Sequence, residues 1–79
     1  MSNQPTKQFR LGLVVASVFE SEHEERTFHS VAVSRLYKAD KEADDWSRTH
    51  SFDLDDLPRV GEVTRQAYVW IQQQRQGEL

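Results

Sequence analysis

Hydrophobic residues follow two different periods along this chain. Between Phe9 and Phe52 they alternate with polar residues or form short apolar runs, a pattern typical of β-strands. From Leu57 onward they recur at helical spacing, and the stripe they form comprises Leu57, Val60, Val63, Thr64, Ala67, Trp70, Ile71 and Gln74. A helix with a single stripe has one face to bury, so we predict that it covers one side of a small sheet.

The β-like part of the chain divides at two charged loops. We predict strands over residues 9–20, 27–38 and 46–52, with a further strand if the first segment bends at Gly12. Together with the helix this gives the expected fold class, α+β: a three- to four-stranded antiparallel β-meander followed by one C-terminal amphipathic helix packed on the sheet.

Both faces of the first predicted strand are partly apolar. One carries Phe9, Leu11, Leu13, Val15, Ser17 and Phe19, and the other carries Arg10, Gly12, Val14, Ala16, Val18 and Glu20. Because a half-exposed strand shows one clean polar face, we expect this strand to be covered on both sides.

The predicted helix has a well-marked beginning. Asp53, Asp55 and Asp56 stand before Pro58, and proline favours the first turn of a helix while restricting the residue before it. We therefore predict one helical turn over residues 54–57, capped by the aspartates, and a main helix from residue 58 to about 75 that stops at Gly77. Gly61 lies inside this helix at a cost of about 1 kcal/mol relative to alanine, which indicates a close approach to the sheet.

Size and composition limit what the chain can be. With 79 residues and no cysteine it is expected to form one domain with a thin core and no disulfides, so self-association is the remaining source of extra stability. We expect residues 1–8 to form a disordered N-terminal arm and residues 9–76 a single α+β domain. The net charge of −3 supplies no global attraction for nucleic acid. No apolar run resembles a signal peptide or membrane span, so a cytoplasmic location is expected.

Catalytic and metal-binding patterns do not rise above background. The acidic cluster at residues 53–56 lacks the glycine and the distal glutamate of a calcium loop. The three histidines, His23, His29 and His50, lack the paired spacing of zinc ligands, and no serine lies in a nucleophile motif. We expect a protein that is not an enzyme and needs no cofactor or metal.

Aromatic and basic residues on the later strands suggest a binding surface. Arg35 and Tyr37 share one face of the second predicted strand, and Trp46 and Arg48 share one face of the third. Sheets that expose arginines and aromatic rings bind single-stranded DNA or RNA through phosphate contacts and base stacking. The candidate nucleic-acid-binding residues are Arg10, Arg35, Tyr37, Lys38, Trp46 and Arg48. The competing interpretation makes the aromatic residues core and pairs the arginines with loop acids.

Apolar residues of the first predicted strand suggest self-association. Leu11, Leu13, Val15 and Phe19 are the candidate interface of a homodimer, since they exceed what one helix can cover. A tightly curled sheet that encloses both faces is the alternative. An apolar sheet face that meets a different chain defines the second functional hypothesis, a protein-interaction or regulatory module without nucleic-acid binding.

Several short motifs resemble those of a group of short, uncharacterised bacterial proteins. The motifs are Phe9-Arg10-Leu11-Gly12, Ser34-Arg35-Leu36-Tyr37-Lys38, Trp46, Ser51-Phe52, Asp55-Asp56-Leu57-Pro58 and Ala67-Tyr68 with Trp70-Ile71. The element order is also similar to the PC4/Whirly type of single-stranded-DNA-binding transcriptional regulators. That resemblance implies a dimer that presents a curved sheet to a single strand, and a role in transcription regulation.

Overall fold

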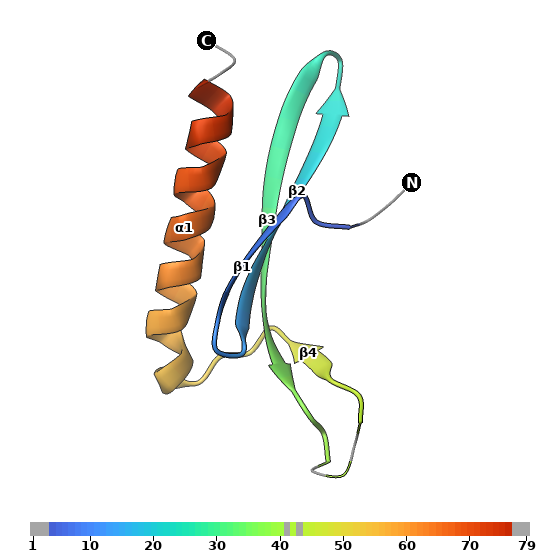
Figure 1. Ribbon diagram of the computed structural model, residues 1–79, viewed down its shortest axis with the longest axis vertical. Helices are drawn as coiled ribbons and strands as arrows, with labels where there is room; N and C mark the ends of the chain where they lie inside the picture. Colours follow the sequence, from blue (N-terminus) through green and yellow to red (C-terminus); the bar gives the residue numbers. More distant parts are fainter. Residues whose placement is uncertain (1–3, 41, 43, 77–79) are drawn as a thin grey trace.

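The four strands of this protein form one antiparallel meander, and a single helix lies along it (Figure 1). A computed structural model describes residues 4–40, 42 and 44–76. The strands are β1 (Lys7–Leu11), β2 (Val14–His23), β3 (Arg26–Tyr37) and β4 (Ser47–Thr49), in the sheet order β1-β2-β3-β4. A 3-10 turn, η1 (Leu54–Asp56), leads directly into α1 (Leu57–Gln76). The predicted α+β fold class is confirmed, with the fourth strand present.

The fourth strand arises because the chain turns at Gly12. Gly12 has a φ of +62°, in the left-handed region that glycine adopts without strain, and Leu11 lies opposite Val14 across the turn. Residues 9–20 therefore form a hairpin rather than one strand. This reverses the alternation beyond the turn, so Phe9 lies on the same side of the sheet as Ala16, its partner in register. The predicted grouping of Phe9 with Val15 on one face is wrong for this reason.

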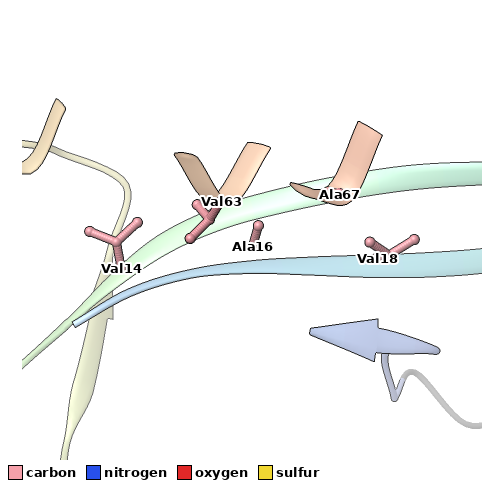
Figure 2. Close-up of a cluster of buried hydrophobic side chains, with 5 residues drawn as sticks. All are labelled: Val14, Ala16, Val18, Val63 and Ala67. Atoms are coloured by element: carbon pink, nitrogen blue, oxygen red, sulfur yellow. The ribbon is translucent and has the colours of Figure 1, made fainter. Parts of the chain in front are cut away.

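The core lies between α1 and the middle of the sheet. It consists of Val14, Ala16 and Val18 from β2 and Val63 and Ala67 from α1, all essentially inaccessible to solvent (Figure 2). The partly buried residues around this core are Phe9, Val33, Phe52, Val60, Trp70 and Ile71. The predicted helical stripe is confirmed in its middle, whereas Leu57 and Gln74 at its ends are exposed.

β2 is also buried on the side that α1 does not cover. Val15 and Ser17 are each only 4% exposed, although they face away from the helix. Val15 lies between Arg10 and Ser34 in the sheet register, and the Gln8 Nε2 donates a hydrogen bond of 3.0 Å to the Ser17 Oγ. Long polar side chains on a neighbouring strand cover apolar surface with their stems. The prediction of burial on both sides is confirmed for Val14–Val18, and one chain is enough to produce it.

The start of α1 follows the predicted capping pattern. The Asp56 carboxylate accepts a hydrogen bond of 3.0 Å from the Asp53 N–H, and the Asp56 N–H donates one of 2.9 Å to the Asp53 carbonyl. These bonds stabilise the single turn that was predicted before the main helix. The prediction for Gly61 is wrong, since a side chain at that position would meet nothing within 4 Å.

The other differences concern where elements begin and end. β1 begins at Lys7, inside the predicted disordered arm, and the Thr6 N–H already donates a hydrogen bond of 2.7 Å to the Val18 carbonyl. Residues 1–3 of that arm lie outside the described residues, as does Gly77. β4 is shorter than the predicted strand over residues 46–52, because only Ser47–Thr49 pair with β3. Within the described part of the chain, no helix is long and apolar enough to cross a membrane.

Candidate nucleic-acid interface

The sheet has one face that α1 leaves uncovered, which we call the open face. The strand register sets its members, because residues paired across an antiparallel sheet point to the same side. They are Gln8, Arg10, Val15, Ser17, Phe19, Ser21, His23, Arg26, Phe28, Ser30, Ala32, Ser34, Leu36 and Arg48.

Charge is divided between the two sides of the sheet. Of the residues in β1–β4, none on the open face is acidic, and three are arginines, Arg10, Arg26 and Arg48. The acidic residues of the strands, Glu20 and Glu22, point to the side of α1. The open face is therefore positive although the chain as a whole carries a net charge of −3.

Arg10 and Arg48 lie on the two outer strands and border the open face. The Arg10 Nε donates a hydrogen bond of 2.9 Å to the Gly12 carbonyl, and the Arg48 Nη1 donates one of 3.2 Å to the Ser34 Oγ. Each guanidinium has five N–H donors in a planar fork, and these bonds use one donor of each. Both side chains are held in place by their bonds while further N–H groups remain for an anion.

Two aromatic rings lie further along the open face, on β2 and β3. Phe19 pairs with Ser30 and Phe28 pairs with Ser21, so the rings are diagonal neighbours across the two strands. Phe28 is half exposed, and small serines flank both rings. The sequence interpretation selected neither residue for nucleic-acid binding, although it placed Phe19 in the candidate dimer interface. The alternation of Val31 and Val33 with Ser30 and Ser34 would have placed the even positions of this strand on the solvent side.

The structure separates Arg35 and Tyr37 from Arg10 and Arg48. Arg48 is opposite Leu36, so Arg35 and Tyr37 point to the other side of the sheet, and their predicted sharing of a face with Arg48 is wrong. The Arg35 Nε lies 3.1 Å from the Asp56 Oδ2, in an ion pair whose side chains are 25% and 13% exposed. The angle at this nitrogen is not that of a hydrogen bond, and the Nε is buried without such a bond. Arg35 pairs with an acid, as the competing interpretation expected, but Asp56 belongs to η1 at the start of the helix and not to a loop.

Lys38 and Trp46 lie in the connection between β3 and β4. The Lys38 Nζ is 5.0 Å from the centre of the Trp46 ring, which is half exposed. This is a cation–π contact at the surface. These two predicted residues therefore lie together, outside the paired strands and next to the ends of β3 and β4.

The four predicted dimer residues do not form one surface. Val15 and Phe19 belong to the open face, and Val15 is already buried within the chain. Leu13 lies in the turn, where its carbonyl accepts a hydrogen bond of 2.9 Å from the Leu36 N–H. Leu11 points to the side of α1. The physical reason is again the turn at Gly12, which reverses the alternation on which the predicted interface depended.

The histidines and carboxylates of the described residues do not converge. No group of three or more metal-ligating residues is found among them. The His29 ring meets Trp70 edge-on, with ring centres 6.1 Å apart, and the His50 Nδ1 lies 3.0 Å from the Val33 carbonyl oxygen. The His23 Nε2 is 3.7 Å from a carboxylate oxygen of its neighbour Glu24. Each histidine thus has a separate local partner.

Comparisons with protein-family models, curated proteins and solved structures found no match for this chain.

Proposed function

We propose that this protein is a non-catalytic module that binds single-stranded DNA or RNA on the open face of its sheet. The observation that carries the proposal is the division of charge, with three arginines and two phenylalanines on a strand surface that lacks acidic side chains. Guanidinium groups bind phosphates, while aromatic rings stack on bases whatever their sequence. The resemblance to PC4/Whirly regulators points to the same ligand, and a cytoplasmic role in transcription regulation belongs to the proposal.

The arrangement of the open face suggests how a single strand would lie on it. Arg10 and Arg48 border one end, and Arg26 stands at the other end, where the β2–β3 hairpin turns. Phe19 and Phe28 lie between these basic positions. In this proposal the phosphates contact the arginines, and bases stack on the two rings, as bases do on the aromatic residues of other four-stranded sheets.

Small side chains around the rings favour this mode of binding. Ser21 and Ser30 flank Phe28 and Phe19 in register, and neither would prevent a base from reaching a ring. Their hydroxyl groups both donate and accept hydrogen bonds, so they suit phosphate or sugar oxygens.

The decisive test is fluorescence polarisation with a labelled oligothymidylate over a range of salt concentrations. We expect salt-sensitive binding by the natural protein and a loss of at least about tenfold in affinity in the Arg10→Gln/Arg48→Gln variant, because two phosphate contacts disappear. The matched control is Arg65→Gln, which removes one positive charge from the exposed surface of α1. Absence of salt-sensitive binding, or an equal loss in the control, would contradict the proposal.

A protein-interaction module is the second candidate, favoured by the exposed apolar residues Leu13 and Phe28. In that case Phe28→Ala would weaken the association with another protein while oligonucleotides fail to bind the natural chain. The polarisation experiment separates the two functions, since only the first requires affinity for a single strand.

A further inference from the structure

The far half of the β2–β3 hairpin is a two-stranded ribbon with two free edges. β1 pairs with β2 only as far as Val18, and β4 pairs with β3 only at Arg35–Tyr37. Among the described residues, no further strand pairs with either side of the ribbon between these pairs and its turn (Figure 1). A free strand edge presents a row of backbone N–H and C=O groups that can pair with another chain.

Two hydrogen bonds show which backbone groups face outward at each edge. The Val18 carbonyl accepts a bond from Thr6 on the β1 side, so Glu20 and Glu22 face outward on that side by the alternation of the strand. The Val33 carbonyl lies 3.0 Å from the His50 Nδ1 on the β4 side. By the same alternation Thr27, His29 and Val31 face outward at the β3 edge.

The two edges differ in how they are protected. On the β2 edge the outward positions carry Glu20 and Glu22, and charged side chains are a common means of preventing edge pairing. The β3 edge has no such protection, because Thr27 to Ser34 contains no charged residue and no proline. Its pairing with β2 is also continuous, without a bulge that would twist the edge away.

We propose that two copies of this chain associate through their β3 edges, in antiparallel pairing about a two-fold axis at His29. This register sets Thr27 of one copy opposite Val31 of the other, and His29 opposite its own counterpart. Each of these outward-facing pairs exchanges two backbone hydrogen bonds. Val33 lies outside the paired region, so its contact with His50 is preserved.

The side chains near the axis fit this arrangement. Val31, 40% exposed in a single copy, comes to lie against Thr27 of the other. On the open face the large Phe28 falls beside the small Ser30 of the second copy. A cleft of about 1020 Å³ separates Thr27 and His29 on β3 from Ile71 and Arg75 on α1, so α1 does not pack against this part of the β3 edge and forms the far wall of the space beside it.

A second copy is the occupant that this edge fits best. The pairing is self-complementary, includes no Asp, Glu, Lys or Arg between Thr27 and Val31, and uses the same groups twice. A protein with a small core also gains stability from association, and the buried core here consists of Val14, Ala16, Val18, Val63 and Ala67. The two sheets become one continuous sheet and their open faces one surface. The inference itself does not depend on nucleic-acid binding.

The experiment measures molar mass by sedimentation equilibrium over a range of protein concentrations. The test variant is Val31→Pro, which removes an outward N–H from the β3 edge without removing a bond to β2. The matched control is Glu20→Pro, which does the same on the opposite edge of the same ribbon. We expect a dimer for the natural protein and for Glu20→Pro, and a monomer for Val31→Pro. A monomeric natural protein, a dimeric Val31→Pro variant or a monomeric control would each overturn the proposal.

Amide hydrogen exchange tests the proposal on the natural protein, so the result does not depend on whether a variant folds. We expect the amides of Thr27, His29 and Val31 to be protected, increasingly so at higher concentration, while those of Glu20 and Glu22 exchange rapidly. Equal rates at both edges at every concentration would overturn the proposal. A dimer that fails to bind oligonucleotides would contradict the proposed function alone, so the two proposals fail separately.

Discussion

Arg35 and Asp56 join the sheet to the start of the helix. The Arg35 Nε on β3 lies 3.1 Å from the Asp56 Oδ2 in η1, and the same carboxylate accepts the N–H of Asp53. Asp56 therefore caps the helical turn and fixes its position on β3. Arg35 can form this pair because the strand register directs it away from the open face.

Replacing Arg35 should affect stability but not binding. We expect Arg35→Ala to lower the free energy of unfolding by about 1–3 kcal/mol, because the largely buried Asp56 carboxylate loses its nearest cation and keeps the Asp53 N–H and the more distant Arg59, 3.9 Å away. Arg65→Ala, which breaks an exposed pair on α1, should cost no more than about 1 kcal/mol. Urea denaturation measures both. Equal stability of Arg35→Ala and the natural protein would contradict the importance of this pair.

Substitution by alanine should raise the stability of the protein at Gly61 and lower it at Gly12. Gly61→Ala should stabilise the protein by about 0.5–1 kcal/mol, because the helix gains propensity and nothing lies within 4 Å of the new methyl group. Gly12→Ala should destabilise it by about 1–2 kcal/mol, since its φ of +62° is strained for alanine. Thermal unfolding of the two variants tests the pair. A change of the same sign in both would show that one of these backbone descriptions is wrong.

The burial of each valine on α1 predicts how much its replacement by alanine lowers the free energy of unfolding. Val63 is fully buried, so Val63→Ala should lower the free energy of unfolding by about 2 kcal/mol through lost contacts and the cavity left behind. Val69 is 39% exposed, and Val69→Ala should change the free energy of unfolding by less than about 0.5 kcal/mol. Chemical denaturation of both variants measures the contrast. Similar losses would mean that α1 packs on the sheet through a different face.

Salt dependence tests Arg10 and Arg48 of the open face separately. If Arg10 and Arg48 each contact one phosphate, the single changes Arg10→Gln and Arg48→Gln should each reduce the slope of log affinity against log salt by about 0.7. Phe28→Ala should lower affinity while leaving the slope unchanged, because stacking releases no counterions. Polarisation titrations at several salt concentrations provide the slopes. A change of slope in Phe28→Ala would assign its effect to something other than stacking.

Glu62 on α1 predicts a limited dependence of stability on pH. Hydrogen bonds from Arg65 and Gln66, together with the charge of Arg65, lower the pKa of Glu62 from 4.5 to about 2. A carboxyl group whose pKa is lower in the folded state stabilises the protein above the unfolded value. That contribution is lost as the pH falls from about 4.5 toward 2.

The natural protein should therefore lose more stability across this interval than Glu62→Gln, by a small amount because the pair is at the surface. Carboxyl chemical shifts measured by NMR should give a midpoint near 2 for Glu62. A midpoint near 4.5 would show that the bonds to Arg65 and Gln66 do not form in solution.

The residues under α1 were predictable because burial follows the period of each element. Val63, Ala67 and Trp70 recur at helical spacing, and the valines of β2 follow the apolar alternation of a strand. The aspartates before Pro58 likewise identified the capped turn. These predictions depend only on near neighbours in the sequence.

The candidate site was predicted less well because it depends on register. Arg10 and Arg48 were selected from their chemistry, and the structure places both on the open face. Arg35 and Tyr37 were selected by the same reasoning, but Arg48 pairs with Leu36 between them. A shift of one residue in pairing moves a side chain to the opposite face, and no local pattern determines that shift.

Hydrophobic period, proline and capping residues act over a few neighbouring positions, so the amino-acid sequence alone predicts the order of the elements and the apolar side of the helix. The folded chain as a whole sets which arginines share a face, which carboxylate pairs with Arg35, and which strand edges remain unpaired among the described residues. These features arise from the turn at Gly12 and from pairing between strands that are distant in the sequence, where the geometry of the whole sheet sets each side chain's direction.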